Sequence, residues 1–505
     1  MEFKAKPSHE TPEITLNNES SFDRANTVTR VARLWMIAAS SMLASVGLLG
    51  CTELTIAWAD LDGKGPVATP ALFLDGRPTL DDWRTDMAPA YRTAFAEQVY
   101  GVAPVEHTTA VEERQLLDEA AFNDKGLVVQ FRLKGSVRFG DKTIPLRDAS
   151  DEGGFHMTLV TPKQRKTPAP VILMETFCPR WAALPHPDVA RPDGAEDFNG
   201  PFSKVATYFF GRYICTPPIE MILDAGYAIA TFQGLDVVPD NDGAGLAELK
   251  RLALGHDNPR TRWGAIAAWA LVYSMAIDAL EAEASLDQNG FIAWGHSRYG
   301  KAALLAAVRD DRIRGVIAHQ SGTGGASLNR RKKGESIKSI TKNYPHWFAP
   351  AYAAFAGREE DLSVDQHILL ALVAPRPVFL GNARRDVWSD PNGAFRAARG
   401  ANPAFEIHGM AGLTSKRLND FRPNDDIAFW IRPGTHGVTE EDWPAFLSFL
   451  DAHFALPHQP EGIQASHPLL PSNPASESLH SSDSRSSERP PDSSFGQEAL
   501  NLHRR

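Results

Sequence analysis

Runs of apolar residues alternate with amphipathic stretches through the middle of the chain, and this pattern predicts strands and helices in turn. Residues 170–174 and 227–232 are continuous apolar runs of strand length, which predict buried strands. Between them, residues 219–226 have helical spacing and end on a glycine. A long apolar-rich helix is expected over residues 262–282. Further strands are expected before Ser297 and at residues 314–319 and 377–381.

Strands that alternate with helices predict an α/β fold, with a mostly parallel sheet covered by helices on both faces. Ligands of such folds bind at the carboxyl ends of the strands. Ser297, Asp386 and His436 each come just after an expected strand or in a loop near one. They are therefore the first residues to consider for chemistry.

The N-terminal segment has a different character. Residues 1–33 form a polar extension, in which Arg30 and Arg33 precede an apolar run that ends at Cys51. A basic flank, a short apolar core and small residues predict an export signal over residues 34–51. Residues 48–51, Leu-Leu-Gly-Cys, resemble a bacterial lipobox, which predicts a lipid anchor at Cys51. A single membrane-anchoring helix, or an ordinary signal cut a few residues later, is the alternative.

These features predict a protein that is exported to the periplasm, anchored to the outer membrane as a lipoprotein, or secreted. Residues 457–505 are rich in serine, proline and charge and lack the apolar residues of a core, which predicts a disordered tail. The expected catalytic domain is residues 70–456. The sequence does not determine the oligomeric state.

Composition narrows the functional classes. The formal net charge is −10, so we expect no binding to nucleic acid. The three cysteines, Cys51, Cys178 and Cys215, lack the spacing of a structural zinc site. Cys178 and Cys215 would be able to pair in an oxidising compartment or remain free thiols, and the sequence leaves both open.

The stretch around Ser297 combines an apolar strand, a turn of small residues and a helix. This arrangement presents a serine hydroxyl at the edge of an α/β-hydrolase sheet. The turn departs from the usual G-x-S-x-G motif, because Gly295 is present but Tyr299 occupies the second glycine's place and Gly300 comes one residue later. A serine in an ordinary small-residue turn is the alternative interpretation.

Asp386 and His436 follow Ser297 in the order Ser…Asp…His that α/β-hydrolases use. A serine hydroxyl is a weak nucleophile, so an imidazole must accept its proton, and a carboxylate must orient and stabilise that imidazole. Asp386 alone would be read as a surface-loop aspartate, and most of the 16 histidines serve other purposes. Together the three residues predict a serine esterase, with the backbone N–H of Arg298 as an oxyanion donor.

The segment Gly295-His-Ser-Arg-Tyr-Gly-Lys301 resembles the signature of the glucuronoyl esterases, carbohydrate esterase family 15. That family also departs from G-x-S-x-G at this position. Other segments resemble the family in the same order along the expected domain: Trp83, and residues 99–104, 224–232, 262–269, 321–326, 344–348, 374–378, 386–391 and 432–436.

The resemblance implies an α/β-hydrolase, a three-layer sandwich, that cleaves the ester between 4-O-methyl-glucuronic acid on xylan and lignin alcohols. It implies Ser297 as nucleophile, His436 as base, and an Arg298 side chain that also faces the oxyanion. Lys301, Glu335 and Trp388 match the positions that hold the uronic acid. A solvated lysine, a surface charge and a core tryptophan are the respective alternatives. No cofactor or metal is implied, and the expected partner is glucuronoxylan or another lignin–carbohydrate ester.

The chain departs from the family pattern in two places. Many members carry the triad acid immediately before Ser321, where this chain has Gln320, so Asp386 is expected to be the acid. Residues 174–180 replace an Asn/Gly-rich turn that borders the site, so the preferred ester is open. The alternatives are an acetyl xylan or other polysaccharide esterase and a catalytically weak carbohydrate-binding relative, against which the Ser297, Asp386 and His436 set argues.

Overall fold

The computed structural model describes residues 71–73, 76–146, 154–165, 167–191 and 207–454. The polar extension (1–33), the signal (34–51) with its lipid anchor and the C-terminal tail (457–505) lie outside the described residues. Within the described ranges, no helix is both long enough and apolar enough to cross a membrane.

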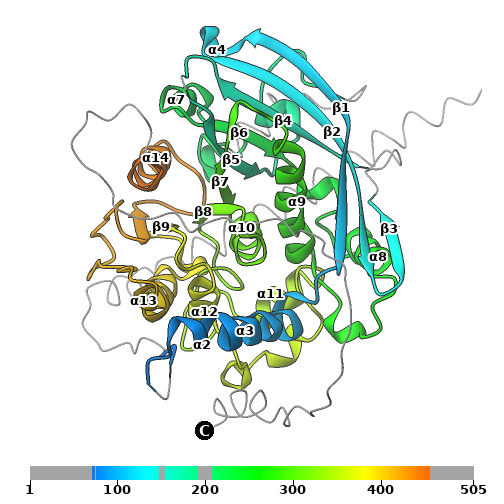
Figure 1. Ribbon diagram of the computed structural model, residues 1–505. Helices are drawn as coiled ribbons and strands as arrows, with labels where there is room; N and C mark the ends of the chain where they lie inside the picture. The colour runs from blue at the N-terminus through cyan, green and yellow to red at the C-terminus, as the bar shows by residue number, and fades with distance from the viewer. Residues whose placement is uncertain (1–70, 74–75, 147–153, 166, 192–206, 455–505) are drawn as a thin grey trace, which may run out of the picture. The chain divides into compact units, whose positions relative to one another are not determined.

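The described part of the chain builds one central sheet with helices around it (Figure 1). The strands are β1 (Glu106–Ala120), β2 (Gly126–Phe139), β3 (Lys142–Pro145), β4 (Phe155–Pro162), β5 (Ala169–Glu175), β6 (Ala228–Phe232), β7 (Leu286–His296), β8 (Ile313–His319), β9 (Val378–Ala383) and β10 (Ile427–Arg432). The helices used below are α3 (Ala88–Phe95), α7 (Ile219–Asp224), α8 (Ala244–Leu252), α9 (Ala265–Leu280), α10 (Arg298–Arg309), α11 (Ile337–Asn343), α12 (Gln366–Ala371), α13 (Pro391–Ile407) and α14 (Asp442–His453).

The strand order is β1-β2-β4-β6-β5-β7-β8-β9-β10, with β3 paired to β2. From β6 to β10 all neighbours are parallel, which confirms the α/β fold expected from the sequence. The remaining pairs, from β1 to β6, are antiparallel. The apolar pattern gave no sign of β1, because most of its side chains are exposed and polar. Cross-strand ion pairs such as Glu112 with Arg132 stabilise this edge instead.

Each central strand contributes to two apolar cores, one on each face of the sheet. In β7, Phe291 and Ala293 join the core under α9, α10, α12 and α13, whereas Ile292 and Trp294 join the core under α7 and α14. Alternate side chains of a strand point to opposite faces, so a strand covered on both sides is apolar throughout. This is why the central strands were visible as continuous apolar runs.

The parallel strands end at one edge of the sheet, and the chain leaves each of them at a residue of the expected site. Ser297 follows β7, Gln320 follows β8, Asp386 comes three residues after β9, and His436 comes four residues after β10. Because β7 to β10 are neighbours in the sheet, residues far apart in the sequence converge there.

Helix α14 is fixed to the sheet by the stacking of Trp443 on Trp294 of β7, and a substitution at Trp443 tests how much this contact contributes to stability. The two rings are nearly parallel with centroids 5.9 Å apart, and both side chains are buried. We expect Trp443→Ala to lower the free energy of unfolding by about 3–5 kcal/mol, since it leaves a large cavity. Trp388→Ala is the matched control because Trp388 is 53% exposed, and we expect a loss below about 1 kcal/mol. Urea denaturation checks both, and equal losses would contradict the packing described.

Candidate active site

Ser297 lies in a sharp turn between β7 and α10, with a φ of 56° and a ψ of −121°. Such a backbone conformation is rare for a residue with a side chain, and it is typical of functional sites. The turn depends on Gly295, since a Cβ there would lie 2.0 Å from the carbonyl oxygen of Tyr299. On the other side, the Ser297 N–H donates to the His319 carbonyl over 2.8 Å.

The shifted second glycine of the motif has a structural explanation. A Cβ on Gly300 would come within 3.0 Å of the Gly295 carbonyl oxygen and 3.1 Å of the Ser321 side chain, so Gly300 provides the close approach of helix to strand. Tyr299 points into the core instead, where its ring contacts Phe177 at 4.6 Å and Trp269 at 5.4 Å between centroids. The turn therefore functions with the glycine one residue late.

His436 and Asp386 are in direct contact. The His436 Nδ1 lies 2.7 Å from the Asp386 Oδ2, and Asp386 is buried. Burial raises the pKa of the Asp386 carboxyl, but the His436 imidazole and the hydrogen bonds from Ser389 outweigh it and hold that pKa below its ordinary value. Asp386 is thus an ionised carboxylate that fixes the His436 ring with Nε2 facing away from it.

Gln320 holds the loop that carries His436. Its Oε1 accepts the Gly437 N–H over 2.7 Å, and its Nε2 donates to the Thr435 carbonyl over 3.3 Å. One side chain therefore clamps the backbone on both sides of the imidazole. An amide can accept and donate at once, whereas an ionised carboxylate can only accept, which explains why glutamine suits a position where Asp386 already supplies the acid.

A pair of buried histidines lies behind His436. The His296 ring packs against the His436 ring with centroids 4.6 Å apart, and its Nδ1 lies 3.1 Å from the His319 Nδ1. Burial and the neighbouring His436 hold the pKa of His296 well below its ordinary value, so this ring is neutral. His319 in turn approaches Asp442, which pairs with Arg432 over 2.8 Å. These contacts place the residue before Ser297 directly against His436.

The guanidinium of Arg298 is enclosed by aromatic rings and one carboxylate. It lies 4.9 Å from the Trp347 centroid, 5.4 Å from that of Phe177 and 6.0 Å from that of Tyr344. Nη1 pairs with Asp240, while the buried Nε has no hydrogen-bond partner in the described structure. Burial lowers the pKa of Arg298, but the ordinary pKa of a guanidinium is so high that the group stays charged. It is held rigidly, and among the described residues its buried Nε–H has no acceptor.

Asp240 anchors this cage. Besides the ion pair to Arg298, its carboxylate accepts hydrogen bonds from the Trp347 indole over 2.7 Å and from His346 over 2.8 Å. Sequence reasoning missed Asp240 as a site residue, because an isolated aspartate carries no motif. Phe177 lay in the segment 174–180, which the sequence placed at the border of the site without a role for the phenylalanine. Tyr344 and Trp347 lay in the segment 344–348, which the sequence pattern singled out without a role.

Lys301, Glu335 and Trp388 come together, as residues that share a site must. The Lys301 Nζ donates to the Ser321 carbonyl, and burial lowers the pKa of Lys301 to about 8 although Glu335 acts to raise it. Burial raises the pKa of Glu335, while Lys301, Lys332 and a hydrogen bond from the Trp388 side chain lower it. Trp388 is 53% exposed, so its ring is open to a ligand. The core-packing alternative for Trp388 is wrong, and Glu335 is buried rather than a surface charge.

The loop after β5 borders the site and is tied by a disulfide. Cys178 is bonded to Cys215, with Cα atoms 5.3 Å apart, so the pairing that the sequence left open is made. Phe177 of this loop contacts Arg298, and the segment that carries Cys215 pairs with the His436 loop through Tyr213 and Val438 over 3.0 Å. The disulfide therefore links the two sides of the site.

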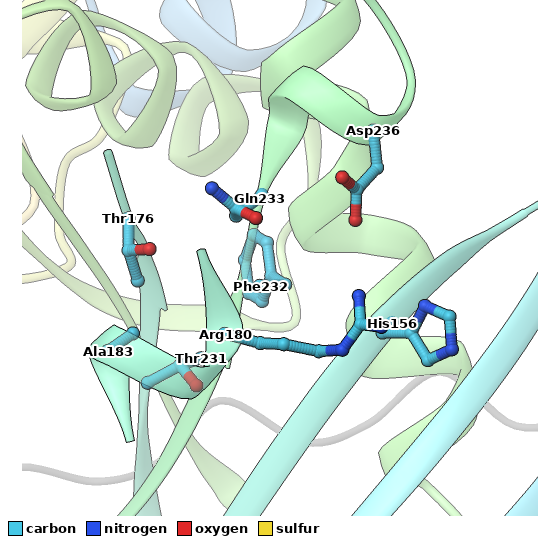
Figure 2. A pocket seen from close by; sticks show the side chains of 8 residues that line it. All are labelled: His156, Thr176, Arg180, Ala183, Thr231, Phe232, Gln233 and Asp236. Atoms are coloured by element: carbon cyan, nitrogen blue, oxygen red, sulfur yellow. The ribbon is translucent and has the colours of Figure 1, made fainter. Parts of the chain in front are cut away.

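A crevice lies beside this loop, at the carboxyl ends of β5 and β6 (Figure 2). Thr176, Phe232 and Gln233 line it, and the Arg180 side chain extends toward His156. It has no room for a water-sized group.

Comparison with known proteins places this chain among carbohydrate esterases. The family model described as "Glucuronyl esterase, fungi" matches residues 206–409. The carbohydrate esterase MZ0003 of an unknown prokaryotic organism is 37% identical over 405 residues, which cover 77% of this chain and 90% of the relative. The 4-O-methyl-glucuronoyl methylesterase 1 of Phanerochaete chrysosporium is 29% identical over 45% of this chain and 47% of its own length.

Solved structures agree with the sequence comparison. A glucuronoyl esterase from Solibacter usitatus has 30% sequence identity and a TM-score of 0.63, over 78% of this chain and 100% of that one. A promiscuous CE15 esterase from a marine bacterial metagenome has 28% identity and a TM-score of 0.64, over 76% of this chain and 97% of that one. The likeness confirms the α/β-hydrolase fold expected from the sequence.

The clamp made by Gln320 predicts an unusual substitution effect. In Gln320→Glu, a carboxylate faces the Thr435 carbonyl and loses the donated hydrogen bond, so we expect esterase kcat to fall about tenfold. The midpoint of thermal unfolding should fall as well. Steady-state kinetics on an activated ester checks this, with Gln288→Glu, at an exposed position near the start of β7, as the matched control. A Gln320→Glu enzyme as active as the unchanged protein would show that the amide clamp is dispensable.

Proposed function

We propose that this chain, which belongs to the glucuronoyl esterases of carbohydrate esterase family 15, hydrolyses 4-O-methyl-glucuronoyl esters that link glucuronoxylan to lignin alcohols. The observation that carries the proposal is the joint position of Ser297, the His436–Asp386 pair and the Arg298 cage at one edge of the sheet. Nucleophile, base, acid and oxyanion donor are then all protein groups.

The first half of the reaction forms an acyl-enzyme. The Ser297 Oγ attacks the ester carbonyl carbon, and its proton passes to the His436 Nε2, while Asp386 accepts from Nδ1 and stabilises the imidazolium. Negative charge develops on the carbonyl oxygen, where the backbone N–H of Arg298 and its unused side-chain N–H donate. The carbon–oxygen bond to the alcohol then breaks, and His436 returns the proton to the departing alcohol.

The second half releases the uronic acid. His436 takes a proton from a water molecule as that water attacks the acyl carbon, and the tetrahedral intermediate collapses with return of the proton to Ser297. The products are a free glucuronic acid on the polysaccharide and an alcohol. The aromatic cage and the ion pair to Asp240 keep Arg298 in position through both steps, so no reorganisation is required when charge develops.

Lys301, Glu335 and Trp388 are the proposed sugar contacts. The buried ammonium and carboxylate bond sugar hydroxyls, and the exposed indole ring of Trp388 offers an apolar platform for a sugar face. These contacts discriminate a uronoyl esterase from an acetyl esterase, which has no uronic acid to hold. They also make a carbohydrate-binding relative without catalysis a poorer fit, since the reacting groups are present beside them.

A broader ester specificity is the second candidate. The loop of residues 174–180 departs from the family's pattern beside Arg298, and one similar enzyme of the family is described as promiscuous. Acetyl xylan or another decorated polysaccharide would then also be a substrate. The two candidate functions differ in the ester that is cleaved, so the glucuronoyl ester and the acetylated polysaccharide should be assayed together.

Export and lipid anchoring are proposals as well. The disulfide between Cys178 and Cys215 supports an oxidising compartment, such as the periplasm or the outside of the cell. The lipobox-like cysteine at position 51 supports a lipid anchor.

Hydrolysis of benzyl glucuronate tests the reaction directly. We expect activity that Ser297→Ala abolishes, and that Asp386→Asn lowers by about 10⁴-fold in kcat because the imidazole loses its carboxylate. Asp451→Asn, remote from the site on α14, is the matched control for the second substitution. Acetylated xylan is assayed in parallel. Cleavage of acetylated xylan alone would contradict the uronate assignment, and full activity of Ser297→Ala would falsify the mechanism.

The lowered pKa of Lys301 predicts a dependence of KM on pH. Above pH 8 the ammonium loses its proton, so we expect KM for benzyl glucuronate to rise between pH 8 and 9 while kcat changes less. Unfolding of the protein does not explain this rise in KM. The pKa of about 8 lies below the ordinary 10.5, so the unfolded state binds more protons and stability rises through that window. In Lys301→Met, KM should be high at every pH and should not rise further above pH 8. If KM of this variant still rises between pH 8 and 9, another group causes the rise.

A further inference from the structure

A cavity of about 730 Å³ lies next to the site described above and shares Tyr344 with it. It is formed where α8, the turn before α9, and α11 with the segment after it meet. Its volume is in the range of small-molecule sites in proteins. The lining residues that matter below are Lys250, Arg260, Arg262, Tyr344, Pro345 and Phe348.

The charge of this cavity is opposite to that of the whole chain. Of the described residues that line it, Lys250, Arg260 and Arg262 are charged, and none is an aspartate or a glutamate. In the part of the chain that the structure describes, no ion pair joins any of the three to a carboxylate, although the chain carries 62 acidic and 52 basic residues. Arg262 is 8% exposed and uses Nη1 to donate to the Trp263 carbonyl, which fixes it in the wall. Three cations held together without counter-charges favour an anionic ligand.

The rest of the wall is apolar and partly aromatic. Tyr344 and Phe348 contribute rings, Pro345 and two further prolines contribute flat apolar faces, and Thr341 adds a hydroxyl. Apolar faces beside a few placed polar groups are what the C–H face of a sugar requires, while carboxylates are the natural partners of guanidinium groups. A sugar that carries a carboxylate satisfies both halves of the wall.

The wall of the cavity is shared with the active site. Tyr344 lies flat against Trp347, with ring centroids 3.8 Å apart and planes 6° from parallel. Trp347 is the ring over which the Arg298 guanidinium lies at 4.9 Å. Tyr344, which lines the cavity, also lies 6.0 Å from the Arg298 guanidinium, so a ligand in the cavity and an ester beside Arg298 would be neighbours.

We propose that this cavity binds an unesterified uronic-acid residue of the polysaccharide whose esterified uronate is cleaved at Ser297. The inference rests on the proposed function for the identity of the polysaccharide. Lys250 and Arg260 bind the carboxylate from the rim, Arg262 from the wall, and Tyr344 supports the sugar ring. Binding there keeps the enzyme on a partly hydrolysed polymer, since every turnover creates a further free uronate.

Calorimetric titration of the Ser297→Ala protein tests the site without hydrolysis. The probe is a xylo-oligosaccharide that carries one free 4-O-methyl-glucuronic acid, and the neutral xylo-oligosaccharide and benzoate are titrated in parallel. We expect Lys250→Gln/Arg260→Gln to weaken binding of the acidic probe at this site by about tenfold, as the loss of charge-assisted contacts implies. Lys338→Gln, on α11 but outside the lining, is the matched control and should leave binding unchanged.

The same variants on the active enzyme separate this site from the catalytic one. Benzyl glucuronate, which is neutral and small, should be hydrolysed by Lys250→Gln/Arg260→Gln with unchanged kcat/KM, while KM for an esterified glucuronoxylan rises several-fold. Equal binding by the double variant and Lys338→Gln would overturn the proposal, as would binding of benzoate with no binding of the acidic sugar. Failure of the proposed function is a different result, namely no benzyl glucuronate hydrolysis by the unchanged enzyme.

Discussion

The backbone turn at Ser297 is the constraint on which the rest of the site depends. A residue with a side chain adopts a φ of 56° only where its surroundings impose it. Here two contacts fix the backbone of Ser297. Gly295 packs against the Tyr299–Gly300 peptide, and the Ser297 N–H donates a hydrogen bond to the carbonyl at the end of β8. The same turn directs His296 against His436 and starts α10 at Arg298. Nucleophile, base and oxyanion donor are thus positioned by one close approach of helix to strand.

Charge around the site is balanced by fixed partners rather than by solvent. Asp386 is paired with His436, Asp240 with Arg298, and Glu335 lies among Lys301, Lys332 and the Trp388 indole. Low exposure strengthens each interaction and makes an unpaired charge costly. Among the described residues, no carboxylate pairs with the three cations of the neighbouring cavity, and in this the cavity differs from the balanced catalytic centre.

The amino-acid sequence predicted the parallel strands β5 to β9, the helices α7, α9 and α10, and the order of Ser297, Asp386 and His436. These features are visible locally, because a strand buried on both faces is apolar throughout and a strand–turn–helix carries its own spacing. The antiparallel strand β1 escaped, since it is polar and mostly exposed and owes its existence to pairing with β2. An edge strand of that kind has no apolar periodicity to detect.

By itself, then, the sequence determined the fold class, the esterase chemistry and the residues that the family resemblance marks, because each is written in a short motif or in a chain order. Tertiary structure alone decided that Gln320 clamps the backbone around His436, that Cys178 and Cys215 pair, and that Asp240 holds an arginine 58 positions away. It also gathered Lys250, Arg260 and Tyr344 into one cavity. Contacts of this kind join residues distant in the chain, and only the folding of the sheet and its helices brings their side chains within reach of one another.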